Sequence, residues 1–594
     1  MKPIIQAAAF VRGAQRDVSM ARNTIADVLA DLLIQAGVQN VWGLPGDSLN
    51  GFTEALRQRE AIRWIGVRHE EVAALAAAGE GDAHGGLAVC AGSCGPGNLH
   101  LINGLFEAQR AHVPMLAIAA QIPSSEIGLG YFQETHPQNL FRECSDYCEL
   151  VSNPAQIPQV LEAAMNSAIV NRSVSVIVLP GDVALSEAPP HSLCWQPPVR
   201  PTVVPPVEAL DVLAGHINDA TKITILGGYG CEGYHDEVLA LAERLKAPIV
   251  HALRGKQSLE YDNSYDVGMT GLIGFSSGYH AMRECDLLIM LGTNFPYREF
   301  FPEHGNIVQI DIRGAHLGRR SPLTMGLVGD IGPTLAALIP KLEDNASTKF
   351  LDACQSHYKK ARANLDDLAT PREGDAPLHP QYLTARVSAL AHDDAVFTAD
   401  VGTPTVWAAR YIRMTRERRL TGSFMHGSMA VAVPAALGWQ VAYPERQVVA
   451  LAGDGGVTML MGDLITLAAE KLPVKVIVYN NETLGFVAME MKAAGYVDST
   501  TNIPRVDFAK LAESLGIRGI QVTASADLDE ALKQAFEHHG PVVVDVRTAK
   551  QELSMPPKIE AKQARGFSLY MLRAVMSGRG DEVVDLGKTN WWGR

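Results

Sequence analysis

Residues 448–456 read Val448-Val449-Ala450-Leu451-Ala452-Gly453-Asp454-Gly455-Gly456, an apolar run that leads directly into a glycine-rich turn. The run predicts a buried parallel strand, and bare glycines after a strand let the backbone approach a phosphate. Asp454 would stand at the carboxyl end of that strand, where a carboxylate can bind a hard divalent cation. A later apolar run ends in Asn480 and Asn481, whose carboxamide oxygens can supply a neutral ligand to the same ion. The pattern therefore predicts a Mg²⁺ ion on a diphosphate, held between two strand ends.

The same alternation of short apolar runs with amphipathic helical stretches extends over most of the chain. β-Branched residues cluster in the runs, and Gly or Pro closes them, which is typical of buried parallel strands. The predicted strands fall into three groups: 64–67, 87–91, 115–122 and 174–179; 223–226, 248–252, 286–291 and 307–312; and 395–399, 448–452, 474–479 and 542–546. We therefore expect an α/β protein with three open, mainly parallel-sheet domains.

Composition shifts mark the boundaries between these groups. A Pro-rich segment and a polar helical stretch separate the domains, and the last residues contain no strand pattern. We expect an N-terminal extension at 1–22, a first domain at 23–185, a linker at 186–208, a central domain at 209–340, a second linker at 341–378, a third domain at 379–550 and a C-terminal tail at 551–594.

The composition is that of a soluble globular enzyme, with 594 residues of which 47% are hydrophobic and 20% are charged. Lys and Arg number 51 against 65 for Asp and Glu, and the net charge of −14 argues against a nucleic-acid partner. The eight cysteines show no CxxC spacing, so we expect reduced thiols in a cytoplasmic protein. No run reaches the ~18 apolar residues of a transmembrane helix, so any membrane contact must be peripheral.

The pairing of Gly-Asp-Gly with Asn-Asn resembles the thiamine diphosphate (ThDP) enzymes, whose signature has these two motifs about two dozen residues apart. The resemblance implies that Asp454, Asn481 and the backbone carbonyl of Thr483 bind Mg²⁺, with Gly455 and Gly456 beside the diphosphate. Gly427, Ser428 and Met429 also match a family motif, in which the Met is an apolar wedge that bends the coenzyme. The alternative for Met429 is an ordinary place in the core.

Glu70 lies in Arg68-His69-Glu70-Glu71, between a predicted strand and an Ala-rich helix. The resemblance implies that its carboxyl group protonates the pyrimidine ring of the coenzyme. We expect Glu71, which would face another direction on the helix, to be solvated, and His69 to be structural.

Further motifs resemble those that line the cofactor and substrate cavity of the family. They contain Asn98, in Gly95-Pro96-Gly97-Asn98, and Phe132 and Gln133, in Phe-Gln-Glu. In these enzymes the Glu-bearing domain of one subunit faces the diphosphate-bearing domain of another. The resemblance therefore implies a homo-oligomer that is a dimer at least; a tetramer is favoured, and the choice between dimer and tetramer stays open.

The central domain contains a glycine turn at 227–230 that lacks the full GxGxxG pattern and is weak evidence alone. Stronger evidence comes from glycines and hydroxyls suited to a pyrophosphate, together with a carboxylate suited to a ribose diol. These features predict an FAD site, and the alternative is a nucleotide fold that binds nothing. The residues concerned are Thr270, Gly271, Leu272, Ile273, Thr293, Asn294, Phe295, Pro296, Tyr297 and Asp311.

The resemblance covers residues 23–594 and is strongest to the flavin-dependent, quinone-linked pyruvate oxidases. It implies that pyruvate is oxidatively decarboxylated to acetate and CO₂ via hydroxyethyl-ThDP, with electrons passing through FAD to ubiquinone. Val401 would pack near the pyrimidine, Leu484 and Gly485 would contact the coenzyme, and Phe486 would shape the pocket over the reacting group. Glu70, Phe132, Gln133 and Phe486 are the residues expected to act in catalysis.

The tail carries apolar residues from Phe567 onward, a break at 577–580, and a second short helix with Asp581 as the expected N-cap. Trp591 and Trp592 would favour a membrane interface, with Lys588 and Arg594 near anionic headgroups. We expect peripheral binding to phospholipid at the inner face of the cell membrane. The alternative is a terminal helix docked on its own protein, and the resemblance implies that the tail covers the active site until the flavin is reduced.

Three other functions remain open. An acetolactate synthase would join two 2-oxo acids and keep its flavin structural. A phosphate-using, O₂-linked pyruvate oxidase would make acetyl phosphate and H₂O₂. A cofactor-bound regulatory binder would not turn over at all.

Overall fold

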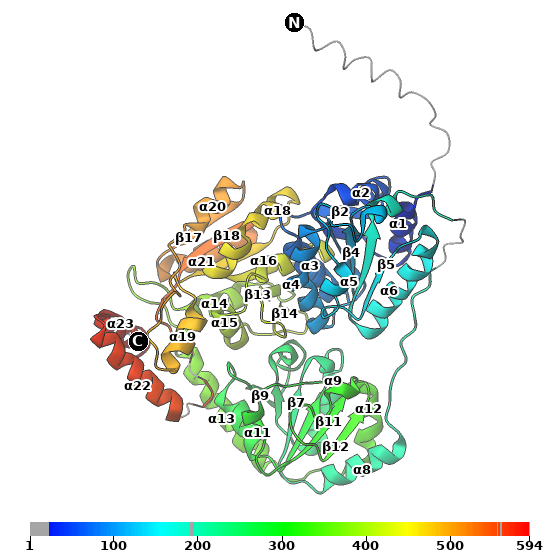
Figure 1. Cartoon of the computed structure of the whole chain (residues 1–594). Helices are drawn as coiled ribbons and strands as arrows, with labels where there is room; N and C mark the ends of the chain where they lie inside the picture. The colour runs from blue at the N-terminus through cyan, green and yellow to red at the C-terminus, as the bar shows by residue number, and fades with distance from the viewer. Residues whose placement is uncertain (1–22, 190–194, 555, 559–560, 593–594) are drawn as a thin grey trace, which may run out of the picture.

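The computed structural model describes residues 23–189, 195–554, 556–558 and 561–592, which form three α/β domains and a helical tail (Figure 1). The expected extension at 1–22 and part of the first linker lie outside the described residues. Each domain contains one six-stranded sheet in which every pairing is parallel. The predicted fold class is therefore confirmed for the three domains.

The first sheet has the order β2-β1-β3-β4-β6-β5. Its strands are β1 Asn40–Gly43, β2 Arg63–Gly66, β3 Ala88–Gly92, β4 Met115–Gln121, β5 Tyr147–Leu150 and β6 Val174–Pro180. The four central strands are fully buried, which explains their continuous apolar sequences.

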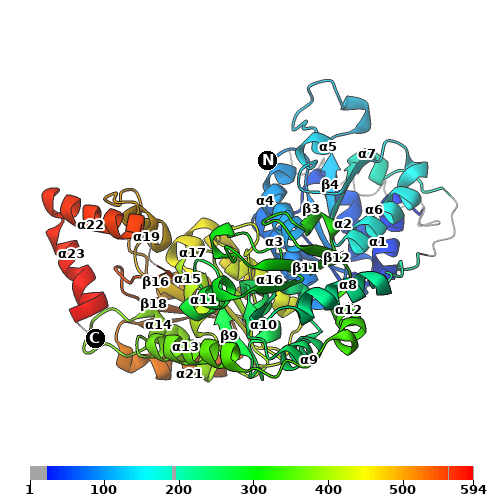
Figure 2. The same ribbon diagram turned by 90° about the horizontal axis from the view of Figure 1, so that it is seen from below.

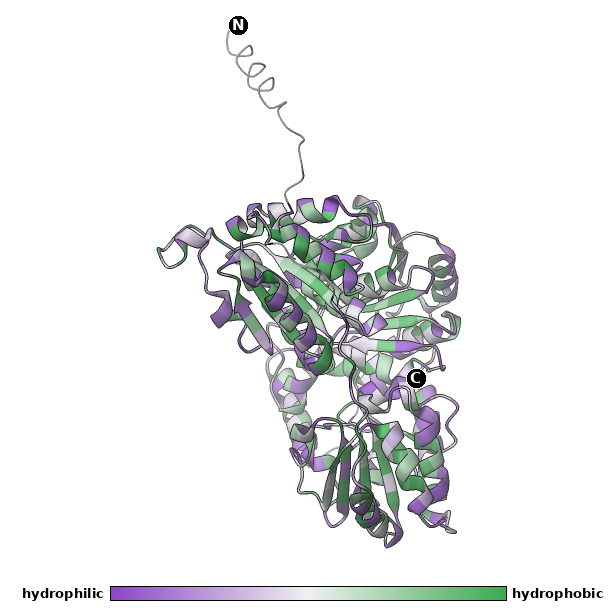
Figure 3. Ribbon diagram, turned by 90° about the vertical axis from the view of Figure 1, so that its right-hand side faces the viewer, coloured by the Kyte–Doolittle hydropathy of each residue, from purple (hydrophilic) through white to green (hydrophobic). Residues whose placement is uncertain are grey.

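The central sheet has the order β12-β11-β10-β7-β8-β9, and the third has the order β14-β13-β15-β16-β18-β17. The central strands are β7 Ile223–Gly227, β8 Ile249–His251, β9 Asp266–Met269, β10 Leu287–Leu291, β11 Asn306–Asp311 and β12 Met325–Val328. The third sheet contains β13 Val396–Ala399, β14 Arg419–Gly422, β15 Val448–Gly453, β16 Lys475–Asn480, β17 Arg518–Val522 and β18 Val542–Arg547. In Figure 3 the strands are mostly hydrophobic, and polar residues gather on the outer helices.

The first and third domains share one hydrophobic core. Helix α3 (Glu70–His84) packs on α16 (Ala432–Ala442), and both carry small residues where they meet. A Cβ added at Gly438 would lie 2.0 Å from the carbonyl oxygen of Ala76, so only glycine permits this crossing. A larger residue at position 438 would therefore push α16 away from α3.

The second linker contains a helix that belongs structurally to the central domain. Helix α13 (Lys349–Asp366) packs against α11 (Ser276–Glu284) and β9. Its Cys354 joins an apolar cluster of the central sheet, with Phe350 and Tyr358 beside it. The many polar residues of this stretch lie on the solvent-facing side of an amphipathic helix.

The tail forms two helices, α22 (Ala561–Met576) and α23 (Gly580–Gly587), followed by a helical turn at Lys588–Trp592. The break between them is confirmed, because Gly578 adopts a left-handed φ of +78°. The prediction of Asp581 as N-cap is wrong: Arg579, two residues earlier, holds the cap position, and Asp581 lies in the first turn of the helix. The Arg579 guanidinium is engaged with Asp498 and Glu582, which fixes the chain direction at that point.

The tail lies on α19 (Gly485–Ala493) at one end of the molecule (Figure 2). The side chains of Trp591 and Trp592, and all of Arg594, lie outside the described residues. Within the described chain, no helix combines the length and apolar character needed to cross a membrane.

Candidate active site

Asp454 and Asn481 lie at adjoining strand ends of the third sheet. Gly453 at the end of β15 pairs with Tyr479 of β16, so the residues that follow each strand meet at one sheet edge. The backbone N–H groups of Asn481 and Glu482 donate to Asp454 Oδ2, at 3.1 and 2.6 Å. The N–H of Gly455 donates to the other oxygen at 2.7 Å. Three donors therefore fix the orientation of the Asp454 carboxylate.

The donor set at this edge fits a hard divalent cation. It contains the Asp454 carboxylate, the Asn481 carboxamide, whose oxygen accepts the Thr483 N–H at 3.1 Å, and the carbonyl of Thr483. Burial raises the pKa of Asp454 to about 6, against the opposing effect of its N–H donors. A bound cation would favour the charged carboxylate and offset that burial cost. Oxygen ligands of this kind are those that Mg²⁺ prefers.

The glycines of the turn have a structural reason beyond access to a phosphate. A Cβ at Gly456 would lie 2.0 Å from Asp400 Oδ2, and one at Gly455 would lie 2.8 Å from Leu484. The turn therefore packs closely against two neighbouring segments.

Asp400 was not identified from the sequence, although it also follows a strand and precedes a glycine-containing turn. Its carboxylate is buried and accepts the N–H of Ala432 at 2.9 Å and that of Gly453 at 3.0 Å. It therefore joins the 453–456 turn to the segment after Met429. Burial raises the pKa of Asp400 to about 6.

Val401 and the residues at 427–429 lie close to this edge. Val401 follows β13 and is half-buried, as is Met429. Ser428 is half-buried and Gly427 is exposed with a φ of +90°.

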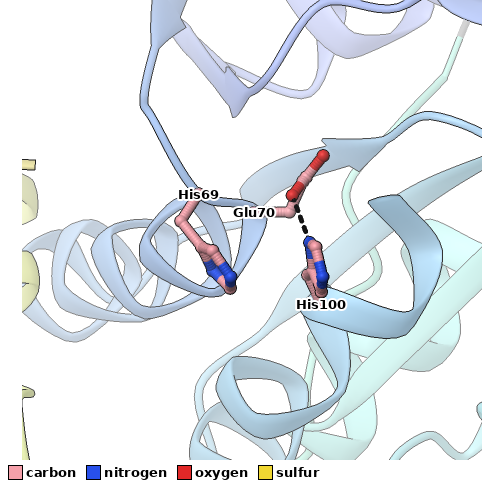
Figure 4. A group of neighbouring side chains, drawn as sticks. All are labelled: His69, Glu70 and His100. Atoms are coloured by element: carbon pink, nitrogen blue, oxygen red, sulfur yellow. Dashed lines mark hydrogen bonds and ion pairs between the residues drawn. The ribbon is translucent and has the colours of Figure 1, made fainter. Parts of the chain in front are cut away.

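Glu70 is the first residue of α3, and its carboxylate is buried (Figure 4). Glu70 Oε2 lies 2.8 Å from His100 Nδ1, and the His100 ring stacks on His69 with 4.4 Å between ring centroids. His69 Nδ1 accepts the N–H of Glu71 at 3.2 Å and so caps the helix, as its expected structural role requires. His100 was missed because its pairing with Glu70 joins two helices.

The three side chains in Figure 4 lie within metal-binding distance of one another. Since His69 Nδ1 is already occupied as a cap, we interpret the cluster as support for the Glu70 carboxylate. Glu71 is not solvated as expected: it is half-buried and accepts from Asn103 Nδ2 at 2.7 Å, because α4 (Pro96–Ala111) packs beside α3.

The remaining residues expected near the substrate lie in three different settings. Asn98 is fully buried and donates to the carbonyl of Ala120 at 2.8 Å. Gln133 is half-buried in a left-handed conformation, whereas Phe132 is 78% exposed on a segment that projects from the first domain near α5 (Pro137–Leu140) (Figure 2). Leu484, Gly485 and Phe486 are half-buried at the start of α19, next to Asn481.

In the central domain, the predicted residues meet at the carboxyl edge of the sheet. Leu291 of β10 is in register with Gly227 of β7 and Ile310 of β11, so the segments after these strands lie together. Thr270 Oγ1 and Asn294 Oδ1 are buried without a hydrogen-bond partner in the described chain. Leu272 and Pro296 are exposed, and Ile273 and Tyr297 are half-buried. The others are buried: Gly271, Thr293, Phe295 and Asp311.

Comparison with known proteins matches all three domains to one family. Residues 23–140 match the N-terminal TPP binding domain of thiamine pyrophosphate enzymes, residues 210–338 match the central domain, and residues 400–546 match the C-terminal TPP binding domain.

Several curated proteins align with most of the chain. A putative thiamine pyrophosphate-containing protein of Bacillus subtilis is 38% identical, covering 96% of this chain and 99% of the relative. A pyruvate oxidase of Lactiplantibacillus plantarum is 31% identical, covering 88% of each. An acetolactate synthase large subunit of Parasynechococcus marenigrum is 30% identical, covering 89% and 88%. The domain matches in this order, with relatives aligned over nearly their whole length, show that the chain belongs to the thiamine pyrophosphate enzyme family.

Proposed function

We propose that the protein is a ThDP- and FAD-dependent pyruvate:quinone oxidoreductase that converts pyruvate to acetate and CO₂ and passes the electrons to ubiquinone. The observation that carries the proposal is the tail. Helix α22 packs on α19, which carries Phe486, and turns an apolar face outward. A pyruvate-converting site is thereby joined to a surface that suits a lipid bilayer, where a quinone resides.

The coenzyme supplies an electron sink for decarboxylation when bound. Asp454, Asn481 and Thr483 would hold its Mg²⁺, and Gly455 and Gly456 would face its diphosphate. Glu70 would exchange a proton with the pyrimidine ring, and Phe486, Gln133 and Phe132 would enclose the substrate.

FAD is favoured by the chemistry of the central domain. The unpartnered Thr270 Oγ1 and Asn294 Oδ1 offer polar atoms to a ligand. Arg254 lies over the ring of Tyr229 at 3.9 Å, in the 227–230 turn. Burial, together with the charges of Arg313 and Arg254, lowers the pKa of His112 to about 3. Arg254 is thus a cation beside the glycine turn that can pair with an anionic diphosphate, alongside the acids Asp82 and Glu232 that also act on Tyr229.

The tail is docked by polar contacts and leaves apolar residues outside. Arg579 bonds the Asp498 carboxylate at 2.7 Å, and Arg573 donates to the carbonyl of Gly495 at 2.7 Å. Leu569, Leu572, Val575 and Met576 are exposed on α22, with Met576 83% exposed. We propose that this face binds phospholipid peripherally, at the inner face of the cell membrane, when the tail is released.

Deleting residues 572–594 is expected to abolish lipid-stimulated quinone reduction and to spare turnover with ferricyanide, which needs no membrane. A finer variant, Leu572→Gln with Val575→Gln and Met576→Gln, removes only the outward apolar face and leaves the docking contacts. It should lose vesicle binding in a flotation assay. Equal lipid stimulation of the wild-type and both variants would contradict the membrane proposal.

A homo-oligomer, with a tetramer favoured, is supported by the projecting segment of the first domain. Leu129 and Phe132 are strongly exposed, and Glu134 holds the segment by accepting N–H groups from Gly128, Gly130 and Tyr131. An apolar tip held this firmly is suited to a pocket of a second copy, in which Phe132 would reach the substrate.

Anaerobic addition of pyruvate to enzyme loaded with ThDP, Mg²⁺ and FAD is expected to bleach the flavin absorbance. Ubiquinone added with liposomes should then restore it. Absence of bleaching with a fully loaded enzyme would contradict the oxidoreductase proposal.

An acetolactate synthase-like carboligase is the second candidate, since such an enzyme aligns with the chain at nearly the same identity as the pyruvate oxidase. Acetolactate among the products without flavin bleaching would establish it. Acetyl phosphate and H₂O₂ would instead indicate a phosphate-using, O₂-linked oxidase.

A further inference from the structure

The segment of Gly427, Ser428 and Met429, here called the 427–429 loop, has left-handed backbone before and after Met429, and only the residue after it, Ala430, incurs a conformational cost. Gly427 has a φ of +90°, and Ala430 has a φ of +63° although it carries a Cβ. A residue other than glycine adopts this region only where its surroundings enforce it. The contacts that enforce it therefore determine where Met429 lies.

The C-terminal end of the loop is held from within the third domain. Asp400 accepts the N–H of Ala432, the first residue of α16, and the N–H of Gly453 before the Asp454 turn. This contact fixes the loop relative to the metal-binding edge.

The N-terminal end of the loop is held by Ser423. The Ser423 hydroxyl accepts the N–H of Gly427 at 3.0 Å and that of Ser428 at 2.8 Å. A hydroxyl has two lone pairs and one proton, so its proton must find an acceptor elsewhere. That acceptor is the carboxylate of Glu107, on α4 of the first domain.

Ser423 and Glu107 are both buried, Ser423 completely, and Glu107 also lines a cavity between the domains. Glu107 is only 5% exposed and forms no ion pair with any described residue. Burying a carboxylate with a single hydrogen bond is costly, and burial raises the pKa of Glu107 to about 7. Glu107 Oε2 accepts the Ser423 proton and leaves both lone pairs of Ser423 for the loop.

A second residue of α4 touches the same loop one helical turn earlier. Asn103 Nδ2 donates to Ser428 Oγ at 2.9 Å, and Asn103 Oδ1 lies 2.8 Å from His426 Nε2. Since residues 103 and 107 lie on one face of α4, the helix presents a continuous polar surface to the loop.

We propose that Glu107 is a positioning residue for the coenzyme: acting through Ser423, it sets the conformation of the 427–429 loop, and so the place of Met429, from a different domain of the same chain. The inference rests on the proposed assignment of this loop to the coenzyme. Glu107 itself touches neither the metal-binding residues nor Glu70 among the described contacts.

The test compares Glu107→Leu with Glu107→Gln in the full chain. Leucine removes the acceptor, whereas the glutamine carbonyl retains it. In the coenzyme-free protein, Glu107→Leu should speed amide hydrogen exchange at Ser428 by about tenfold, the value of one lost buried hydrogen bond. The effect at Gly427 should be smaller, because its N–H also donates to the Ser423 carbonyl at 2.8 Å. Calorimetric titration with ThDP at saturating Mg²⁺ should show an affinity about tenfold weaker. Glu107→Gln should restore both.

Two further variants keep the test decisive. Ser423→Ala breaks the same link from the other side and should reproduce Glu107→Leu. Glu80→Leu removes an equally buried acid, also 5% exposed and bonded to Asn40 and Trp42, and should leave exchange at 427–428 unchanged.

Unchanged exchange at Gly427 and Ser428 in both Glu107→Leu and Ser423→Ala would overturn the positioning role. Faster exchange with an unchanged ThDP affinity would overturn the coenzyme assignment of the loop instead. Neither result depends on which 2-oxo acid or electron acceptor the enzyme uses, so both differ from a failure of the proposed reaction.

Discussion

Glu70→Gln is expected to lower kcat for pyruvate turnover by about 10²- to 10⁴-fold, the usual contribution of a positioned acid–base group. Glutamine has nearly the same shape and can still meet His100, but its amide cannot exchange the proton that the pyrimidine ring requires. The affinity for ThDP should change little, because the residues proposed to hold Mg²⁺ and the diphosphate lie in another domain. Steady-state kinetics and a ThDP titration measure the two effects separately.

Glu80→Gln is the matched control for Glu70→Gln. Glu80 is a buried acid on the same helix, bonded to Asn40 and Trp42 away from the site. Its replacement should leave kcat nearly unchanged. If Glu70→Gln kept more than half of the wild-type kcat, or lost coenzyme affinity instead, the assignment of Glu70 as the proton-exchanging group would be wrong.

Asp454→Ala is expected to weaken Mg²⁺-dependent ThDP binding by at least about a hundredfold. Replacing a residue that only hydrogen-bonds a metal ligand already lowers metal affinity by about 10- to 100-fold, and Asp454 is a proposed ligand itself. The change removes the only carboxylate among the proposed metal ligands. It also leaves the N–H groups of Gly455, Asn481 and Glu482 without the acceptor that Asp454 provides. Calorimetry with ThDP at varied Mg²⁺ gives both affinities.

Asp454→Asn should weaken ThDP binding almost as much. Both carboxylate oxygens of Asp454 accept N–H groups, so the NH₂ of asparagine would face an N–H donor in either orientation. Asp463→Asn provides the control: Asp463 is a buried acid nearby that accepts the N–H of Arg68 at 2.8 Å and the Thr466 hydroxyl. Near-normal Mg²⁺ dependence in Asp454→Ala would place the metal elsewhere.

Most interior strands were predictable from the sequence and most edge strands were not, although the interior strand β1 was missed and the edge strand β2 was found. Strands such as β4, β10 and β16 are buried on both faces, so their sequences are continuous apolar runs. The edge strands β5, β14 and β17 are partly exposed and mix polar with apolar residues, which hides them among loops. Edge strands β9 and β12 are only four residues long and contain glycine.

The site shows the same division between local and long-range information. The meeting of Asp454 with Asn481 follows from parallel strand order, because both residues stand at carboxyl ends of neighbouring strands. The contact of Glu107 with Ser423 joins residues 316 positions apart on separate domains, so no local sequence pattern predicts it. The prediction that Glu71 is solvated failed for a similar reason. Helical geometry shows that Glu71 points away from Glu70, but it does not show that α4 packs on that side.

The shared core of α3 and α16 has a consequence for how the protein is made. Helix α3 leaves the ribosome long before α16, which at 5–20 residues per second is a delay of roughly 20 to 70 s. Throughout that interval the face of α3 that packs on α16 in the folded chain has no native cover, although its other faces can already pack on α4 and β3. A nascent chain is therefore expected to expose this Ala-rich face until the third domain has been made.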